Sequence, residues 1–283
     1  MIEVKDLVVE YSDFKLNCSI KVENNRITGL VGKNGAGKTT LFKSILGLCK
    51  IESGAIFVNN KEISKLTLKD KESIGVVLGD SFYSSHFTCK DICTISKNFY
   101  ADFDEKYFLD NCKKLNIPLD KKLKDFSTGM LGKTKVLTAT SHKASLLILD
   151  EPTSGLDVQA RTEILDLLHD YMDINKDCSI VVSSHISSDL EKICDDIYFI
   201  DDGTIILHED TDVLLDDYGI IKVRAKANDF DMSYLLYQKK TSYGYDIITN
   251  KKLFYTNKYP DLIVDKGTID EILMIIMGGE KLC

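Results

Sequence analysis

The stretch Gly32-Lys33-Asn34-Gly35-Ala36-Gly37-Lys38-Thr39 matches the pattern G-x-x-x-x-G-K-S/T. An apolar run, Ile27–Val31, precedes it, and a helix-like stretch that starts at Thr40 follows it. The glycines allow backbone N–H groups to turn inward around a polyphosphate, and the first turn of the helix adds partial positive charge. In this pattern Lys38 reaches the phosphates and the Thr39 hydroxyl binds Mg²⁺. A strand, this loop and a helix in that order predict a nucleotide-binding α/β protein.

Length and charge restrict the class of protein. The chain has 283 residues, of which 44% are hydrophobic, which suits one large domain or a domain with an appendage. It carries 36 Lys and Arg against 44 Asp and Glu, so its net charge is −8. Because duplex binding generally needs a basic face, we do not expect nucleic acid as a partner.

The first residues, the apolar runs and the cysteines bear on location. Met1–Asp6 alternate charged with apolar residues and lack the basic start and apolar core of a signal peptide. A membrane-spanning helix needs roughly 18 to 20 apolar residues, and Ile272–Met277 is only a short run. We therefore expect a cytosolic chain with eight reduced cysteines. His86, Cys89 and Cys93 do not have a standard zinc spacing, so no metal site is expected there.

Short apolar runs alternate with helical patterns around the phosphate loop. Three stretches suit an antiparallel layer: Ile2–Val9, Leu16–Val22 and Gly54–Val58. Five suit buried strands: Ile27–Val31, Ile74–Leu78, Leu146–Leu149, Ile180–Ser183 and Ile197–Ile200. Helical patterns fall at Thr40–Leu48, Asp104–Leu115, Leu131–Thr140, Val158–Met172 and Ser187–Ile193. This alternation predicts an α/β core with a largely parallel sheet and an inserted helical subdomain at about residues 80–141.

Two adjacent carboxylates, Asp150 and Glu151, end the apolar strand that starts at Leu146. Adjacent acids repel each other unless a cation offsets their charge. Mg²⁺ does so when Asp150 lies in its coordination shell, and Glu151 then orients and polarises the water that attacks the γ-phosphate. The alternative is a strand that simply leaves the core into a solvated turn, which the presence of Lys38 in the same chain disfavours.

The order of the motifs resembles that of the ATP-binding subunits of ABC transporters, most of all the ABC-2 type export ATPases. The family's signature loop is similar to Phe126-Ser127-Thr128-Gly129-Met130, its D-loop to Ser154-Gly155-Leu156-Asp157, and its switch histidine to His185. The resemblance covers about residues 1–210 and implies the ABC ATPase fold. It also implies ATP and Mg²⁺ as ligands, catalytic roles for Glu151 and His185, and nucleotide contacts from Gly32 through Thr40.

Five residues carry specific expectations from this resemblance. Ser127, Thr128 and Gly129 would contact the γ-phosphate held by a second copy, so that ATP joins a head-to-tail homodimer; an ordinary helix cap accounts for Ser127 equally well. His185 would hydrogen-bond the γ-phosphate, at a strand end where ligand contacts are expected. Tyr11 would stack on adenine, although one of 13 tyrosines at a strand end also suits an exposed surface position.

Two regions depart from the family's pattern. Gly79 and Asp80 stand where a glutamine usually touches Mg²⁺ and the attacking water. Asp80 is a substitute oxygen ligand in this interpretation, and hydrolysis is slower or more dependent on a partner if it does not take that role. In the signature loop, Thr128 and Met130 replace glycine and glutamine, changes that leave the backbone donors in place.

The chain after about Leu215 is harder to interpret. It contains alternating stretches, Gly219–Ala225 and Lys252–Thr256, and a capping box, Thr268–Glu271, which opens a final helix that Gly278 ends. These features predict a small ordered α+β appendage. We expect a nucleotide-binding domain at residues 1–215 and an accessory region at residues 216–283.

The resemblance implies a cytoplasmic ATPase, peripheral to the membrane, that powers export through a separate integral membrane permease; import is less favoured. A soluble regulatory ATPase without a permease is the alternative from another class, which the acidic charge and the single nucleotide unit disfavour. A protein that binds ATP without hydrolysing it is a third alternative, which the missing glutamine keeps open.

Overall fold

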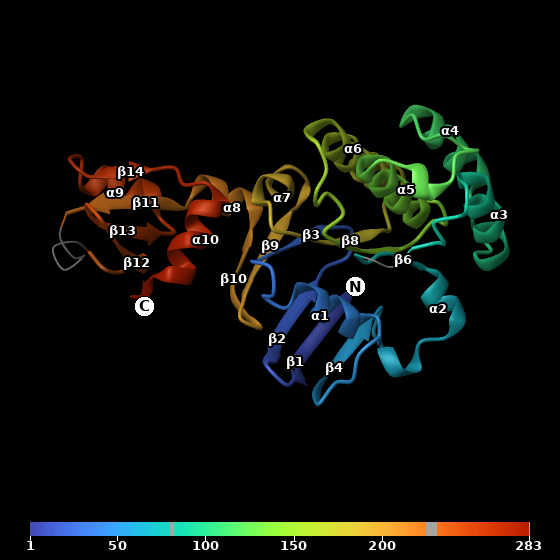
Figure 1. Ribbon diagram of the computed structural model, residues 1–283. Coiled ribbons are helices and arrows are strands. Elements are labelled where there is room, and N and C mark those ends of the chain that lie inside the picture. The colour runs from blue at the N-terminus through green and yellow to red at the C-terminus, as the bar shows by residue number, and fades with distance from the viewer. Residues whose placement is uncertain (80–81, 225–230, 283) are drawn as a thin grey trace.

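The computed structural model describes residues 1–79, 82–224 and 231–282, so the predicted metal ligand Asp80 lies outside the described residues. The described residues form three sheets (Figure 1). The first is antiparallel, has the order β2-β1-β4-β5, and consists of β1 (Ile2–Tyr11), β2 (Phe14–Val22), β4 (Ser53–Val58) and β5 (Lys61–Glu62). It contains the three strands that the sequence predicts for an antiparallel layer.

The second sheet positions the phosphate loop. Its order is β10-β9-β3-β8-β7-β6, and neighbouring strands are parallel except for β10, which is antiparallel to β9. The strands are β3 (Ile27–Val31), β6 (Ile74–Val77), β7 (Leu146–Asp150), β8 (Ser179–Ser184), β9 (Asp196–Asp201) and β10 (Thr204–Asp210). Strands β3, β7 and β8 are buried throughout, which explains their continuous apolar runs. The predicted α/β fold with a largely parallel sheet is confirmed.

Helices cover both faces of this parallel sheet. Helix α1 (Lys38–Ile45) lies between it and the antiparallel sheet, where Phe42 shares an apolar core with Val4 of β1 and Ile148 of β7. Helices α6 (Val158–Ile174) and α7 (Ser187–Ile193) cover the opposite face (Figure 1). Neighbouring residues of β7 therefore belong to different cores, because successive side chains of a strand point to opposite faces.

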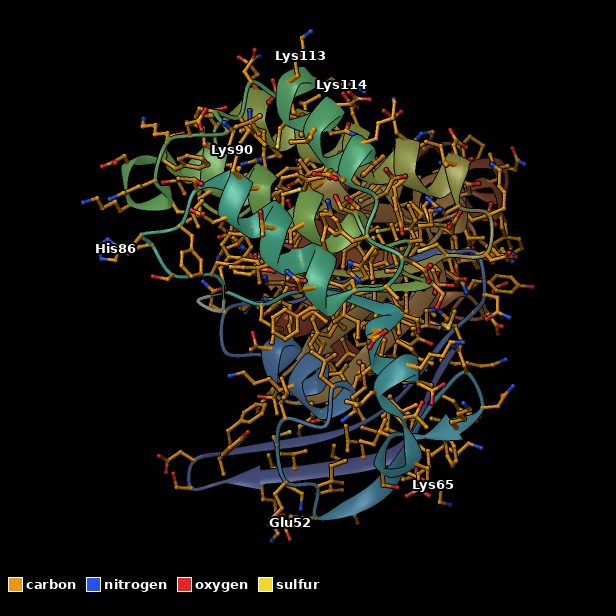
Figure 2. All side chains as sticks on the ribbon, turned by 90° about the vertical axis from the view of Figure 1, so that its right-hand side faces the viewer. Glu52, Lys65, His86, Lys90, Lys113 and Lys114 are labelled. Atoms are coloured by element: carbon orange, nitrogen blue, oxygen red, sulfur yellow. The ribbon has the colours of Figure 1, made fainter. Side chains whose placement is uncertain are left out.

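The described residues between β6 and β7 are mainly helical. They contain the helices α3 (Cys89–Phe99), α4 (Glu105–Lys114) and α5 (Thr128–Thr140). Two further elements, the short 3-10 turn η1 (Ile63–Lys65) and helix α2 (Leu68–Glu72), come before β6. A second 3-10 turn, η2 (Leu123–Asp125), leads into α5. Cys89 and Cys93 are buried, whereas Figure 2 shows the exposed His86 side chain extending away from the helices. Among the described residues, no group of three or more His, Cys, Asp or Glu side chains could hold a metal ion.

The C-terminal region forms the third sheet, which is antiparallel and has the order β14-β11-β13-β12-β15. Its strands are β11 (Gly219–Val223), β12 (Leu235–Thr241), β13 (Gly244–Thr249), β14 (Ile263–Asp265) and β15 (Glu280–Lys281). Its helices are α8 (Thr211–Asp216), α9 (Lys252–Lys258) and α10 (Ile269–Gly278). The predicted capping box of α10 is present, with the Thr268 and Glu271 side chains bonded to each other's backbone N–H.

One alternating stretch of this region is not a strand. Lys252–Thr256 forms the first part of helix α9. The buried Tyr255 and the partly buried Tyr259 are four residues apart, which places them on one face of a helix against the sheet. Local alternation is a weak signal over five residues, and packing against β11 and β13 decides the conformation here.

The C-terminal sheet does not have a separate core on its inner face. Leu214, Ile220 and Ile269 belong to the same apolar cluster as Leu190 of α7 and Ile197 of β9. The backbone N–H of Ile269, at the start of α10, also donates to Glu191 Oε1 of α7 at 3.3 Å.

In the described part of the chain, no helix has the length and apolar character of a membrane span.

Candidate functional site

The phosphate loop joins β3 to α1 and depends on glycine at two positions for its path. Gly37 has a φ of 111°, in the left-handed region, and a Cβ there would lie 2.9 Å from the Phe14 ring. A Cβ on Gly32 would lie 2.4 Å from the carbonyl oxygen of Ile200. The loop therefore packs directly on β9, and larger residues at these two positions would displace it. Lys33, Asn34 and Gly35 at its tip are exposed.

Lys38 lies inside the curve of this loop and is only 5% exposed. Its Nζ donates to the carbonyl oxygens of Gly32 at 2.6 Å and Lys33 at 3.2 Å. The same atom is 3.1 Å from Glu151 Oε1, which places the cation beside the predicted catalytic carboxylate. A buried ammonium group with oxygen partners on one side is suited to attract phosphate oxygens on the other.

Asp150 joins the loop to the parallel sheet. Its Oδ2 accepts from the Thr39 hydroxyl at 2.6 Å, and its Oδ1 accepts from the Ser183 hydroxyl at 2.7 Å. A hydroxyl and a carboxylate oxygen in contact form the kind of oxygen pair that binds Mg²⁺, so Thr39 and Asp150 fit the predicted metal. The sequence reasoning did not single out Ser183, although a polar residue that ends a buried strand next to β7 was the available signal.

Glu151 and His185, predicted as catalytic partners, lie in contact. Their Oε2 and Nδ1 atoms are 2.5 Å apart. The backbone of Glu151 has a φ of 51°, an uncommon conformation for a residue other than glycine, and its N–H donates to Ser183 Oγ at 2.9 Å. Its Oε1 is buried and has no hydrogen-bond partner within the described residues, although Lys38 is close to it. That oxygen is suited to accept a proton or a hydrogen bond from a water molecule beside the phosphates.

The loop faces a cavity of about 600 Å³, whose wall includes Phe14, Thr40, Glu151 and Asp202. Tyr11, which is 52% exposed, lies in the wall of a neighbouring cavity of about 570 Å³ that shares Phe14 and Asp202. The stacking role of Tyr11 remains a prediction. Phe14 is the aromatic residue that lines both cavities, and the sequence reasoning did not identify it.

The signature loop begins α5. Ser127 is the N-cap of this helix, and its Oγ accepts from the Met130 N–H at 3.2 Å. Ser127 and Thr128 are exposed, and Gly129 is half-buried. The helix-cap role is thus present in the structure, whereas contact with a second copy's nucleotide remains a prediction. Asp157 of the predicted D-loop is likewise a cap, because its Oδ1 accepts from the Ala160 N–H at 2.8 Å at the start of α6.

A further cavity of about 430 Å³ brings the two halves of this region together. Thr39, Asp150 and Glu151 line it. Thr128 and Lys135 of α5, together with Gly79, line it too. The carboxylates and the signature helix of one chain therefore share a wall, and the position without the expected glutamine lies beside them.

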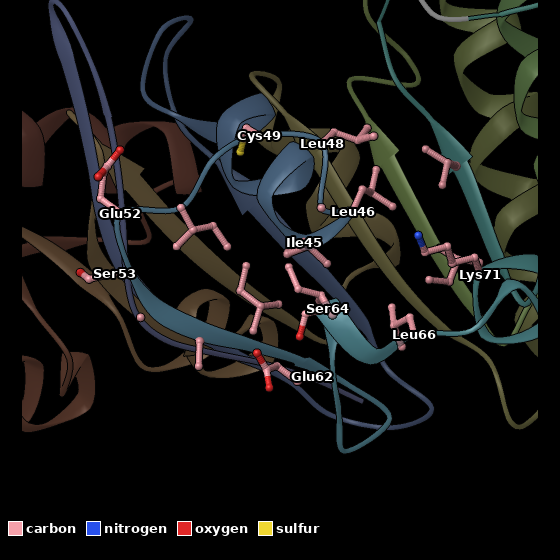
Figure 3. Close-up of a pocket in the computed structure, with 18 of the residues that line it drawn as sticks. Ile45, Leu46, Leu48, Cys49, Glu52, Ser53, Glu62, Ser64, Leu66 and Lys71 are labelled. Atoms are coloured by element: carbon pink, nitrogen blue, oxygen red, sulfur yellow. The ribbon is translucent and has the colours of Figure 1, made fainter.

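A larger cavity, of about 800 Å³, lies at the other end of α1 and was not predicted from the sequence. Figure 3 shows its lining side chains, which come from α1 and the turn after it, from β4 and from the stretch between β5 and α2. Leu48, in the turn after α1, is 62% exposed at its edge. We call this cavity the apolar groove. Val76 and Tyr100 also line a smaller cavity of about 350 Å³ next to it.

Comparisons with known proteins agree with this site. Residues 16–154 match the family model described as ABC transporter. The chain is 29% identical over 262 residues to the ABC transporter ATP-binding protein YtrB of Bacillus subtilis, covering 92% of this chain and 87% of YtrB. It is 30% identical over 211 residues to the bacitracin transport ATP-binding protein BcrA of Bacillus licheniformis, covering 73% of this chain and 68% of BcrA.

A solved structure has the same fold at lower sequence identity. It is a dimeric ATP-binding cassette in a post-hydrolysis state, bound to ADP and Pi, with 18% identity and a TM-score of 0.65. The match covers 75% of this chain and 99% of that chain. At this identity the likeness concerns the fold.

Proposed function

Because this chain belongs to the family of ABC transporter ATP-binding proteins, we propose that it hydrolyses ATP between two copies of itself and thereby powers export through a separate integral membrane permease. The observation that carries the hydrolytic part is a set of contacts around one loop: Glu151 with both Lys38 and His185, and Asp150 with Thr39. A protein that only bound ATP would not need a carboxylate and an imidazole held together beside the phosphate position.

Each group has a defined task in this proposal. The loop N–H groups and Lys38 hold the phosphates, and Thr39 and Asp150 hold Mg²⁺, which offsets the negative charge of the phosphates. Glu151 accepts a hydrogen bond from the attacking water and orients it toward the γ-phosphate. His185 holds the Glu151 carboxylate and donates toward the same phosphate. The protein thus contributes chiefly positioning and electrostatic stabilisation.

The exposed signature loop supports a dimer. Ser127 and Thr128 carry their backbone donors at the start of a 13-residue helix and face outward. A helix start attracts anions, and a second copy would bring its γ-phosphate to this position. The related cassette bound to ADP and Pi is dimeric. Two composite sites of this kind would follow from one two-fold axis.

The apolar groove supports a permease partner. Its wall combines the apolar residues Leu46, Leu48, Ile51 and Val76 with the charged residues Glu52, Glu62 and Lys71. An exposed concavity that carries apolar side chains generally marks an interaction site. We propose that a segment of the permease at the cytoplasmic side of the membrane covers this groove. The export direction rests on the likeness to ATP-binding proteins such as the bacitracin transport protein.

Phosphate release from the purified chain tests hydrolysis. The parent should release phosphate from ATP in the presence of Mg²⁺, and Lys38→Ala should reduce the rate by at least about 100-fold, because one buried cation faces the phosphates. Lys33→Ala is the matched control, since this exposed lysine of the same loop contributes a carbonyl rather than its ammonium group. Equal rates in parent and Lys38→Ala would contradict the proposal.

Affinity capture from detergent-solubilised cells tests the permease. The parent should retain a multi-span membrane protein, identified by mass spectrometry, and Leu48→Asp should lose it while keeping its phosphate release. Ile174→Asp is the control, because Ile174 is also exposed but lies at the end of α6, away from the groove. Recovery of soluble partners alone would favour a regulatory ATPase without a permease.

A further inference from the structure

We infer that Lys135 of α5 is a positioning residue for ATP hydrolysis: it holds the backbone of Gly79 beside the catalytic carboxylates, at the position that lacks the expected glutamine. This inference rests on the proposed hydrolysis. Lys135 Nζ donates to the carbonyl oxygen of Gly79 at 2.5 Å and lies 5.9 Å from the centroid of the Phe82 ring. A hydrogen bond from a charged donor is roughly twice as strong as one between neutral groups.

Helix α5 runs along β6 and contacts it at two levels. A Cβ on Gly75 would lie 2.4 Å from the carbonyl oxygen of Ala139, so the two backbones approach closely there. Gly79 follows Gly75 by four residues, and Lys135 precedes Ala139 by four residues. The Lys135 bond is therefore the second attachment of an antiparallel helix and strand, and it lies at the end nearer the signature loop.

This second attachment is at the catalytic end of the sheet. Val77 of β6 pairs with Leu149 of β7, which is followed directly by Asp150 and Glu151. Gly79 is two residues beyond Val77, in the wall of the cavity that contains Thr39 and both carboxylates. A displacement of this turn would change the wall that faces the attacking water.

No packed side chain holds Gly79 in place among the described residues. Apart from its chain neighbours, none of their heavy atoms lies within 4 Å of a Cβ built at this position. The bond from Lys135 supplies the restraint that a packed side chain would otherwise provide. Because a misplacement of about 1 Å can lower a reaction rate by up to about 100-fold, one such bond is sufficient to affect turnover.

Lys135 also stands between the catalytic cavity and the cavity next to the apolar groove. Its side chain lines the cavity of about 430 Å³ with Glu151 and the cavity of about 350 Å³ with Val76 and Tyr100. A partner that presses on Val76 or Tyr100 would therefore act close to the residue that holds Gly79. This position distinguishes Lys135 from the other lysines of the helical region.

The test compares steady-state phosphate release and the Tm of the parent, Lys135→Met, Lys135→Arg and Lys114→Met. Lys114 is the control because its Nζ donates to Asp170 at 2.9 Å on the outer surface of α4 (Figure 2). Lys135→Met should lower kcat about tenfold, with the KM for ATP changed less than about twofold. Lys135→Arg should recover at least about half of the parent kcat, since it keeps a charged donor.

Three results would overturn the inference: a parent-like kcat in Lys135→Met, equal losses in Lys135→Met and Lys135→Arg, or a Tm far below that of Lys114→Met. A parent that releases no phosphate would instead contradict the proposed function. Hydrogen exchange without nucleotide then decides the role of Lys135. Lys135→Met should speed exchange at Leu78 and Gly79 and leave Ile74 unchanged, whereas unchanged exchange at all three amides would overturn the restraint.

Discussion

The phosphate loop and the signature loop are both built at the start of a helix, yet they are held in different ways. Lys38 and Asp150 are each 5% exposed and have several partners within the chain. Ser127 and Thr128 are exposed, and the Ser127 hydroxyl serves its own helix. A site whose groups are already oriented is ready for its ligand, whereas an outward-facing loop becomes a ligand contact only when another surface supplies the ligand.

The largest effect on turnover should come from a change beside the phosphate loop, whose groups are already oriented. Glu151→Gln removes the carboxylate that orients water in the proposed function, so kcat should fall about 1,000-fold while ATP binding persists and a dimer accumulates. Phosphate release, nucleotide binding and size-exclusion chromatography with ATP measure these three properties. Glu52→Gln, a change of an exposed residue in the wall of the groove at the other end of α1, is the control. Turnover near the parent rate would remove Glu151 from its catalytic role.

The second largest effect on turnover should come from a change in the exposed signature loop. Ser127→Asp keeps a good N-cap but places a negative charge where a second copy's phosphate would lie, so kcat should fall at least about tenfold at nearly parent stability. Mixing this variant with Lys38→Ala should restore up to about a quarter of the parent rate, because half of the dimers are mixed and each has one intact site. No restoration in exchanging dimers would mean that the signature loop acts within its own chain.

A graded series should separate the metal ligand from its support. Asp150→Asn removes a charge from the Mg²⁺ position and should raise the Mg²⁺ concentration for half-maximal turnover about tenfold. Ser183→Ala keeps the Asp150 charge and removes the hydroxyl that donates to Asp150 and accepts from the Glu151 N–H, so about a threefold rise is expected. Titration of phosphate release with Mg²⁺ gives both values. A larger effect for Ser183→Ala would reverse the assigned order of roles.

The smallest effect concerns the far end of the signature helix. His142 is buried directly after α5 and stacks on Tyr100, and burial lowers the pKa of its imidazole. The His142 imidazole is therefore protonated more readily in the unfolded chain than in the folded one. The folded state loses stability as the pH falls below the ordinary pKa of about 6.5 toward the lower pKa of the folded chain. His142→Phe should make unfolding less sensitive to acid between about pH 7 and pH 5. Equal pH dependence in denaturant unfolding would assign that sensitivity to other groups.

The two halves also differ in how far the sequence predicts them. The phosphate loop and the carboxylates follow from local patterns, because a buried strand, a glycine loop and a helix are adjacent in the chain. Fold class and the final capping box were predicted correctly for the same reason. The contacts of Ser183 with Asp150 and of Lys135 with Gly79 join residues 33 and 56 positions apart. No local pattern contains such a pair, and the orientation of parallel strands and α5 creates both.

In the C-terminal appendage, a local sequence pattern predicted the wrong conformation. The alternation of Lys252–Thr256 is a local pattern, but helix α9 forms because Tyr255 and Tyr259 pack on the neighbouring sheet. The apolar groove was missed because it is assembled from α1, β4, β6 and the segment between β5 and α2. Its residues are individually unremarkable, and only their position around one cavity indicates a common use.

The apolar cluster that joins Leu214, Ile220 and Ile269 to Leu190 and Ile197 has a consequence for cooperativity. Unfolding of the C-terminal sheet would expose apolar side chains of α7 and β9 to water. Unfolding of either the C-terminal region or the ATPase core alone would therefore be unfavourable. A calorimetric scan should therefore record a single heat-absorption peak for the whole chain, with equal calorimetric and van't Hoff enthalpies. The C-terminal appendage and the ATPase core would then share one melting temperature, as parts of one cooperative unfolding unit.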